Sequence, residues 1–137
     1  MFTKISISAQ VAADAAKAWE CYTDPKHIVN WNFAIPEWHC PSASNDLRVG
    51  GTYSARMEAR DGSFGFDFGA VYTAVEMGKS FSYQLGDNRM VDVRFIPSAE
   101  GTLVEVDFDA ENQNPIEMQR GGWQAILNNY AQYAAQQ

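Results

Sequence analysis

Apolar and polar side chains alternate along most of this chain, with the period of two typical of strands that bury one face. The first such run, residues 2–9, places Ile5, Ile7 and Ala9 on one face. From residue 42 to residue 110 the alternation resumes in about six further runs, which short turns separate. Successive strands joined by short turns pair antiparallel, so we expect one antiparallel sheet with an apolar face and a solvated face.

Turn residues mark where these strands begin and end. Gly50-Gly51 predicts a bulge or a sharp bend, and Asp61-Gly62 predicts a hairpin turn. The alternation through Phe66 and Phe68 slips near Gly69-Ala70. A second bulge is therefore expected at Gly69-Ala70.

Two segments near the N-terminus carry a helical period instead. Pro25 starts the second and shorter one, which runs to about Asn30. Residues 31–41 hold two prolines and two tryptophans without a clear period, so we expect a loop that folds back over the core or forms a lid. The first helical segment begins near residue 12 and is rich in alanine, and its shared apolar face comprises Ala15, Ala18, Trp19 and Tyr22.

The last stretch, residues 114–137, is predicted to form one long amphipathic helix. Asn114 is a suitable N-cap, Pro115 suits the first helical position, and Glu117 is placed to complete a capping box. The pair Gly121-Gly122 interrupts the helix, and each glycine costs about 1 kcal/mol relative to alanine. The apolar stripe, which needs a large surface to cover it, comprises Ile116, Trp123, Ile126, Leu127, Tyr130 and Ala134.

Together these patterns predict a single α+β domain over residues 1–137, in which two short helices follow the first strand. A curved antiparallel sheet of about six to seven strands would grip the long C-terminal helix on its apolar face. One helix cannot fill a wide concave sheet, so a cavity lined by aromatic side chains should remain between them. Gly121-Gly122 would widen this cavity beside Trp123.

Short motifs spread over nearly the whole chain carry a family resemblance. They are Trp31-Asn32, Trp38-His39-Cys40-Pro41, residues 45–51, Asp61-Gly62, Phe66-Asp67-Phe68 and Gly122-Trp123. In these motifs the chain resembles the activator of heat-shock-protein-90 ATPase homologue-like family of the SRPBCC superfamily. The resemblance implies the helix-grip (START-like) fold and a hydrophobic small molecule bound in the cavity. Some superfamily members are hydrolases, cyclases or aromatases and some carry lipids, while the co-chaperones that name the family imply a chaperone-interaction module as a further alternative.

Aromatic side chains are the candidates for a binding site, since 4 Trp, 6 Tyr and 8 Phe are many for 137 residues. The simplest interpretation is that most of them fill the core, and Phe95 and Phe108 fit it best. Tyr53, Tyr83 and Trp38 are stronger candidates for a ligand wall, because each brings a polar atom into an apolar site. The predicted ligand-binding residues are Trp31, Trp38, Tyr53, Phe66, Phe68, Tyr83 and Trp123.

Asp67 and His39 are the weaker candidates for catalysis. Asp67 lies between Phe66 and Phe68, so strand alternation exposes it if the phenylalanines face the cavity, whereas the neighbouring bulge would turn it inward and perturb its pKa. His39 and Cys40 are adjacent, and neighbours in an extended segment point to opposite sides, which keeps them from pairing as base and nucleophile. An enzyme that uses Asp67, His39 or a cavity tyrosine as acid or base is the alternative to a binding protein.

Charge and motif content narrow the possible partners. The net charge of −7 disfavours nucleic acids and anionic membranes, which bind clustered Lys and Arg. No signal peptide or membrane span is visible and Cys21 and Cys40 form no CxxC motif, so we expect a cytoplasmic protein with reduced thiols. We find no phosphate loop, metal-ligand run or Ser-His-Asp order and predict neither a metal nor a cofactor. The expected partner is an apolar small molecule or lipid, and a monomer and a homodimer both stay open.

Overall fold

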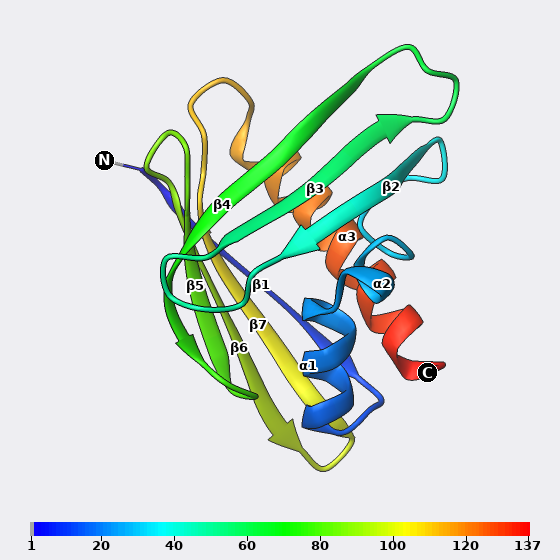
Figure 1. Ribbon diagram of the computed structural model, residues 1–137, viewed down its shortest axis with the longest axis vertical. Helices are drawn as coiled ribbons and strands as arrows, with labels where there is room; N and C mark the ends of the chain where they lie inside the picture. The colour runs from blue at the N-terminus through cyan, green and yellow to red at the C-terminus, as the bar shows by residue number, and fades with distance from the viewer. Residues whose placement is uncertain (1) are drawn as a thin grey trace.

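The computed structural model describes residues 2–137 as one curved seven-stranded antiparallel sheet with three helices (Figure 1). Met1, the first residue of the expected domain, lies outside the described residues. The elements are β1 (Lys4–Val11), α1 (Ala15–Thr23), α2 (Pro25–Ile28), β2 (Trp38–Asn45), β3 (Thr52–Ala59), β4 (Gly65–Glu76), β5 (Ser80–Leu85), β6 (Met90–Ser98), β7 (Gly101–Asp109) and α3 (Ile116–Ala135). The strand order β1-β7-β6-β5-β4-β3-β2 confirms the predicted antiparallel sheet. The element order confirms two short helices after the first strand and one long helix after the last.

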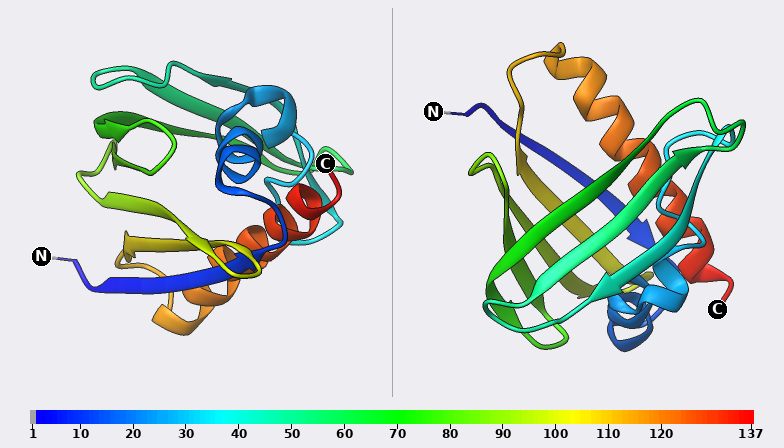
Figure 2. Two further views of the ribbon diagram at one scale, coloured as in Figure 1. Left: turned by 90° about the horizontal axis from the view of Figure 1, so that it is seen from below. Right: turned by 45° about the horizontal axis from the view of Figure 1, so that its top comes forward.

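The sheet curls into an open half-barrel, and its concave face holds the core (Figure 2). Alternation puts every second residue of β3, β5, β6 and β7 inside, as in Tyr53, Ala55 and Met57 of β3. Phe95 and Phe108 are 4% and 0% exposed, which confirms them as core residues. Burying these apolar faces is the main term that stabilises the fold, at roughly 25 cal/mol per Å² of apolar surface.

Sharp turns lie where the glycines predict them. Gly50 has a φ of 85° in the turn between β2 and β3, and Gly62 has a φ of 78° in the hairpin between β3 and β4. Both values fall in the left-handed region, which glycine enters without a steric penalty. The second predicted bulge is misplaced, however, because β4 pairs with β3 without a break through Gly69-Ala70. The shift in register occurs between Tyr72 and Ala74, opposite β5, so Phe66, Phe68 and Tyr72 stay on one face of β4.

The segment expected to be a loop ends earlier than predicted, because β2 already begins at Trp38. Pro41 and a shift in register between His39 and Ser42 interrupt the alternation of apolar and polar residues, so the sequence pattern does not indicate this strand. A proline is tolerated there because β2 is the edge strand of the sheet, where one side of the backbone needs no ladder partner. The loop prediction holds for residues 31–37 and is wrong for Trp38–Pro41.

The long C-terminal helix is confirmed, but its predicted cap is wrong. Pro115 is the N-cap residue, and no side chain caps the helix. Asn114 instead donates from Nδ2 to Glu111 at 3.1 Å, and Glu117 pairs with Arg120 at 3.5 Å. Gln119 fixes the start of the helix, because its Nε2 donates to the backbone oxygen of Asn114 at 2.8 Å.

The helix α3 lies along β1 and reaches α1, so it covers one side of the half-barrel rather than its centre (Figure 2). Two of its long side chains bind the backbone of β1. Arg120 Nη1 donates to the oxygen of Ser6 at 3.1 Å, and Gln124 Nε2 donates to the oxygen of Ser8 at 3.0 Å. These contacts fix the helix along the edge of the sheet and leave the concave face partly uncovered. Among the described helices, none is long and apolar enough to cross a membrane.

We expect the Gly121→Ala variant to be more stable than the natural chain by about 0.5–1 kcal/mol. Gly121 lies inside α3, and a Cβ built there meets nothing within 4 Å, so the helix gains from alanine without a steric cost. The free energy of unfolding in urea measures the change.

Gly51→Ala is the matched control. A Cβ at Gly51 would lie 2.0 Å from the backbone oxygen of Asp46, so the same substitution should destabilise the fold there. A Gly121→Ala variant that loses stability would contradict the open surroundings of this helical turn.

Candidate ligand cavity

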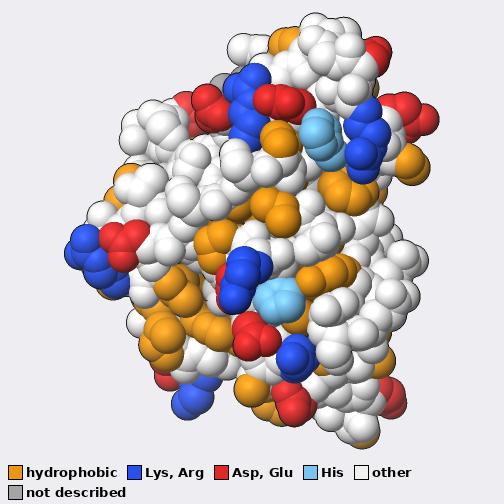
Figure 3. Space-filling view, turned by 45° about the vertical axis from the view of Figure 1, so that its right-hand side comes forward, with side chains coloured by type: hydrophobic (Ala, Val, Ile, Leu, Met, Phe, Trp, Pro, Cys, Tyr) orange, Lys and Arg blue, Asp and Glu red, His pale blue; other side chains and the backbone are white. Residues whose placement is uncertain are grey.

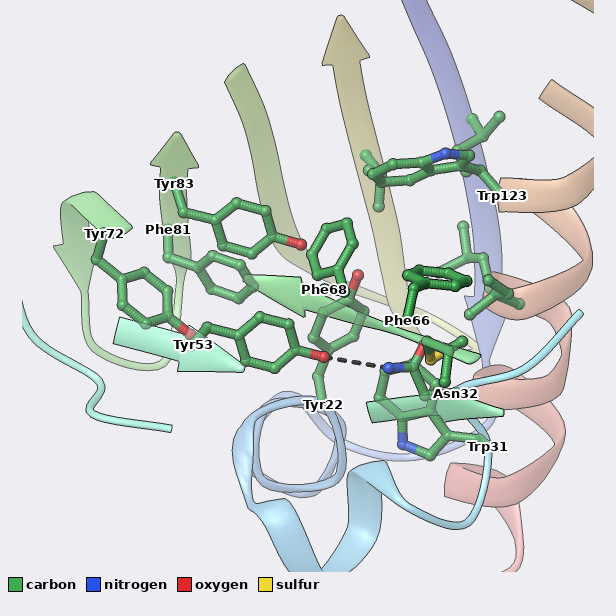
Figure 4. Close-up of a pocket in the computed structure, with 15 residues that line it drawn as sticks. Tyr22, Trp31, Asn32, Tyr53, Phe66, Phe68, Tyr72, Phe81, Tyr83 and Trp123 are labelled. Atoms are coloured by element: carbon green, nitrogen blue, oxygen red, sulfur yellow. Dashed lines mark hydrogen bonds between the residues drawn. The ribbon is translucent and has the colours of Figure 1, made fainter. Parts of the chain in front are cut away.

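An apolar cavity of about 190 Å³ lies between the concave face of the sheet and the helices (Figure 4). Six of the predicted ligand-binding residues line it: Trp31, Tyr53, Phe66, Phe68, Tyr83 and Trp123. The other lining residues are Ile7, Tyr22, Asn32, Met57, Tyr72, Phe81, Val106, Ile126 and Leu127. No Lys, Arg, Asp, Glu or His side chain is among these lining residues.

The sheet side of the cavity is a wall of packed aromatic rings. Tyr53 and Tyr83 stack with ring centroids 5.7 Å apart and an interplanar angle of 5°. Phe81 stacks on Tyr83 at 5.8 Å, and Phe68 meets Tyr83 edge to face at 6.2 Å. These rings come from β3, β4 and β5, whose ladder pairing holds them in register. The wall is therefore rigid and offers ring faces and edges to a guest.

Trp123 and Trp31 close the cavity from the helical side (Figure 4). The indole of Trp123 stacks on Phe108 of β7, with centroids 4.0 Å apart and planes 9° apart. Trp31 follows α2, and its Nε1 donates to the backbone oxygen of Cys21 at 2.9 Å. Both tryptophans are thus held by contacts outside the cavity and present their apolar rings to it.

Two tyrosines of the wall have protein partners for their hydroxyl groups. Asn32 Nδ2 donates to the hydroxyl of Tyr53 at 3.2 Å, and the Tyr72 hydroxyl donates to Asn45 Oδ1 at 2.7 Å. Burial raises the pKa of Tyr53 well above its ordinary value and that of Tyr72 to about 12. Both groups are neutral near pH 7, and each already has one hydrogen-bond partner in the protein.

The predicted wall residue Trp38 does not line the cavity. Its ring packs against those of Phe64 and Phe66, near the hairpin between β3 and β4. The ring centroids lie 5.9 Å and 6.0 Å from that of Trp38. Trp38 pairs with Ala59 at the end of β3, beyond the part of the sheet that the cavity reaches. Phe66 both lines the cavity and is 42% exposed, so this aromatic group marks the opening to solvent.

The face that includes the helices carries apolar side chains in patches between charged groups (Figure 3). Lys and Arg side chains stand apart on this face, often next to Asp or Glu (Figure 3). Elsewhere, Arg94 of β6 pairs with Glu105 and Asp107 of β7 at 3.1 Å each. A continuous basic surface of the kind that binds a phosphate backbone is not present on this face.

Asp67 and His39, the candidates for catalysis, lie outside the cavity. Asp67 follows strand alternation and points to solvent, with its side chain 73% exposed. Its Oδ1 lies 3.4 Å from Nη1 of Arg56. His39 Nε2 lies 3.8 Å from a carboxylate oxygen of Glu58, and both side chains are more than a third exposed. Neither residue lines the cavity, so the prediction that they act there as acid or base is wrong.

The cysteines and the acidic side chains form no second centre of chemistry within residues 2–137. Cys21 and Cys40 are both free thiols, and burial raises the pKa of each, which keeps them protonated and weakly nucleophilic. Over the same residues, no three His, Cys, Asp or Glu side chains come together as a metal site would require. The cavity is therefore the main candidate site of the described chain.

Sequence reasoning missed several wall residues, above all Tyr22 and Asn32. Tyr22 lies on the apolar face of α1, where its position predicted core packing. Asn32 is only 9% exposed, and its partner Tyr53 is far away in the sequence. A polar-tipped aromatic on an apolar helix face is also what an ordinary core residue such as Trp19 presents, so it did not single out Tyr22.

A curved antiparallel sheet that curls around a long C-terminal helix, with an apolar cavity between them, defines a helix-grip domain. A family model described as "Activator of Hsp90 ATPase homolog 1-like protein" matches residues 12–135. The chain belongs to this family, as its sequence motifs predict.

Solved structures agree with this assignment. The AHSA1-like protein from Aeromonas hydrophila is 40% identical, with a TM-score of 0.90 over 96% of this chain and 91% of that one. Chr148 from Cytophaga hutchinsonii is 41% identical, with a TM-score of 0.80 over 98% and 92% of the two chains. CV1439 from Chromobacterium violaceum shares the fold at 20% identity, with a TM-score of 0.84 over 96% of each chain. No curated protein matches the chain.

Proposed function

We propose that this protein binds a small apolar or aromatic molecule in the cavity between its sheet and α3. The observation that carries the proposal is a cavity of about 190 Å³ whose lining includes no charged side chain. Protein interiors are normally packed without voids of this size, because each missing contact forfeits dispersion energy. A guest would restore those contacts, and the fold family commonly holds hydrophobic ligands in the same place.

The volume limits the size of the guest. Apolar cavities of about 150 Å³ hold a benzene molecule. A cavity of about 190 Å³ therefore suits one aromatic ring with a short substituent. The partly exposed Phe66 at the opening gives such a guest a route from solvent. A long lipid chain would require the opening to widen.

We expect ethylbenzene to bind and to raise the melting temperature. At a concentration 100 times the dissociation constant, a ligand that binds only the folded state adds about 2.7 kcal/mol to the free energy of unfolding. For a domain of this size, that corresponds to a rise in melting temperature of roughly 8–12 °C. Differential scanning calorimetry gives the shift in melting temperature. NMR chemical shifts of the indole N–H of Trp123 and Trp31 report whether the guest lies in the cavity.

The matched control is 1,3,5-triisopropylbenzene, which has the same chemistry but is too wide for the cavity. It should shift neither the melting temperature nor the indole resonances. Absence of any effect of ethylbenzene on both measurements would overturn the proposed function. Equal binding of the two hydrocarbons would show instead that the cavity opens to take larger guests, such as lipids.

A further inference from the structure

Two tyrosine hydroxyl groups point into the cavity and have no hydrogen-bond partner among residues 2–137. They belong to Tyr22 of α1 and Tyr83 of β5, and Tyr83 is only 6% exposed (Figure 4). The two other cavity tyrosines, Tyr53 and Tyr72, do have partners, at 3.2 and 2.7 Å. The wall therefore holds two hydroxyl groups that have a protein partner and two that have none.

These two groups are open to the cavity rather than sealed in the core. Within the described residues, every sealed side-chain nitrogen or oxygen has a hydrogen-bond partner. A hydroxyl group without a partner in apolar surroundings is unfavourable, because it has lost water and gained nothing. Tyr22 and Tyr83 would regain a hydrogen bond if the guest carried a polar atom between them.

The charge of that polar atom follows from the surroundings. Burial raises the pKa of both tyrosines, so each hydroxyl stays protonated and able to donate near pH 7. The lining contains no cationic side chain, so a carboxylate guest would leave water without a counter-ion. A neutral acceptor avoids that cost. A carbonyl oxygen has two lone pairs and can accept from two donors at once.

We propose that the guest is a small neutral aromatic carbonyl compound, whose oxygen accepts hydrogen bonds from the hydroxyl groups of Tyr22 and Tyr83. The ring of the guest packs against the aromatic wall, and its carbonyl group faces the helix α1 and strand β5. This inference rests on the proposed function and adds the chemical class of the ligand to it.

Three probes of similar size separate the two proposals. They are ethylbenzene, which has no acceptor, acetophenone, which has a neutral carbonyl group, and benzoate, which is charged. Isothermal titration calorimetry gives the dissociation constant of each. Tyr22→Phe and Tyr83→Phe should each weaken the binding of acetophenone by about threefold to tenfold, the effect of one hydrogen bond. The dissociation constant of ethylbenzene should change by less than about twofold in both variants. Benzoate should bind at least about tenfold more weakly than acetophenone.

Tyr133→Phe is the matched control variant. Its hydroxyl lies 2.6 Å from His27 Nδ1 outside the cavity, so its loss should leave acetophenone binding unchanged. The infrared carbonyl stretch of bound acetophenone provides a readout in the natural chain. Hydrogen bonding lowers its frequency relative to acetophenone in hexane, and each Tyr→Phe variant should reverse part of that shift.

The outcomes are distinguishable. If acetophenone binds equally to the natural chain and both variants, or its carbonyl stretch matches that in hexane, the carbonyl assignment is overturned while ethylbenzene binding keeps the proposed function. Tightest binding of benzoate also overturns the assignment. If neither ethylbenzene nor acetophenone binds, both proposals fall. Retained ethylbenzene affinity shows that each variant is folded.

Discussion

An Ile126→Trp variant should bind ethylbenzene about 10- to 100-fold more weakly than the natural chain. Ile126 lines the cavity from α3, between Trp123 and the buried Leu127. An indole at this position would fill the space that the guest needs. Losing the burial of one apolar group of this size costs about 1.5–3 kcal/mol, which sets the expected change in affinity. Isothermal titration calorimetry measures it directly.

Ile35→Trp provides the control for this substitution. Ile35 is 49% exposed and does not line the cavity, so the same added bulk should leave ethylbenzene affinity unchanged. The folded state of both variants can be compared by circular dichroism. Undiminished binding by Ile126→Trp would place the guest somewhere other than this cavity.

A Phe108→Ala variant should lose about 3–5 kcal/mol of unfolding free energy, the usual cost of removing a buried aromatic ring. Phe108 is fully buried in β7, between Ile5 of β1 and Val91 of β6. Its ring also stacks on Trp123 at 4.0 Å, so the substitution removes the support of one cavity wall. The loss is a large share of the roughly 5–15 kcal/mol that stabilises a typical domain.

Urea unfolding followed by tryptophan fluorescence measures this loss. Phe64→Ala is the matched control, because Phe64 is 61% exposed and its removal should change stability by no more than about 0.5 kcal/mol. A loss below about 1 kcal/mol for Phe108→Ala would mean that α3 and the sheet close around the vacated space.

Much of the fold could be predicted from the sequence because strand alternation and helical period are local signals. The turns at Gly50 and Gly62 and the helix that carries Trp123 all follow from short-range patterns. The start of β2 at Trp38 did not, because an edge strand tolerates Pro41 and its pairing shifts just before Ser42. The helix cap also escaped prediction, since the contacts of Gln119 depend on how residues 111–114 fold back.

The candidate site was predicted less completely, because a cavity is a property of packing between distant segments. Trp123, Tyr53 and Tyr83 could be selected as inward aromatic residues of a helix and two strands. The sequence could not show that Trp38 lies past the end of the cavity. It also could not separate Tyr22 from ordinary core residues, because which hydroxyl groups find partners depends on contacts between distant parts of the chain.

The two contacts from α3 to β1 also affect how the protein meets other chains. A strand at the edge of a sheet offers free backbone groups on which another strand can add, and such addition leads to aggregation. Arg120 and Gln124 occupy the outward oxygens of Ser6 and Ser8, so this edge has fewer acceptors to offer. The helix that bounds the cavity thereby protects the first strand, and loosening this helix would expose a surface prone to self-association.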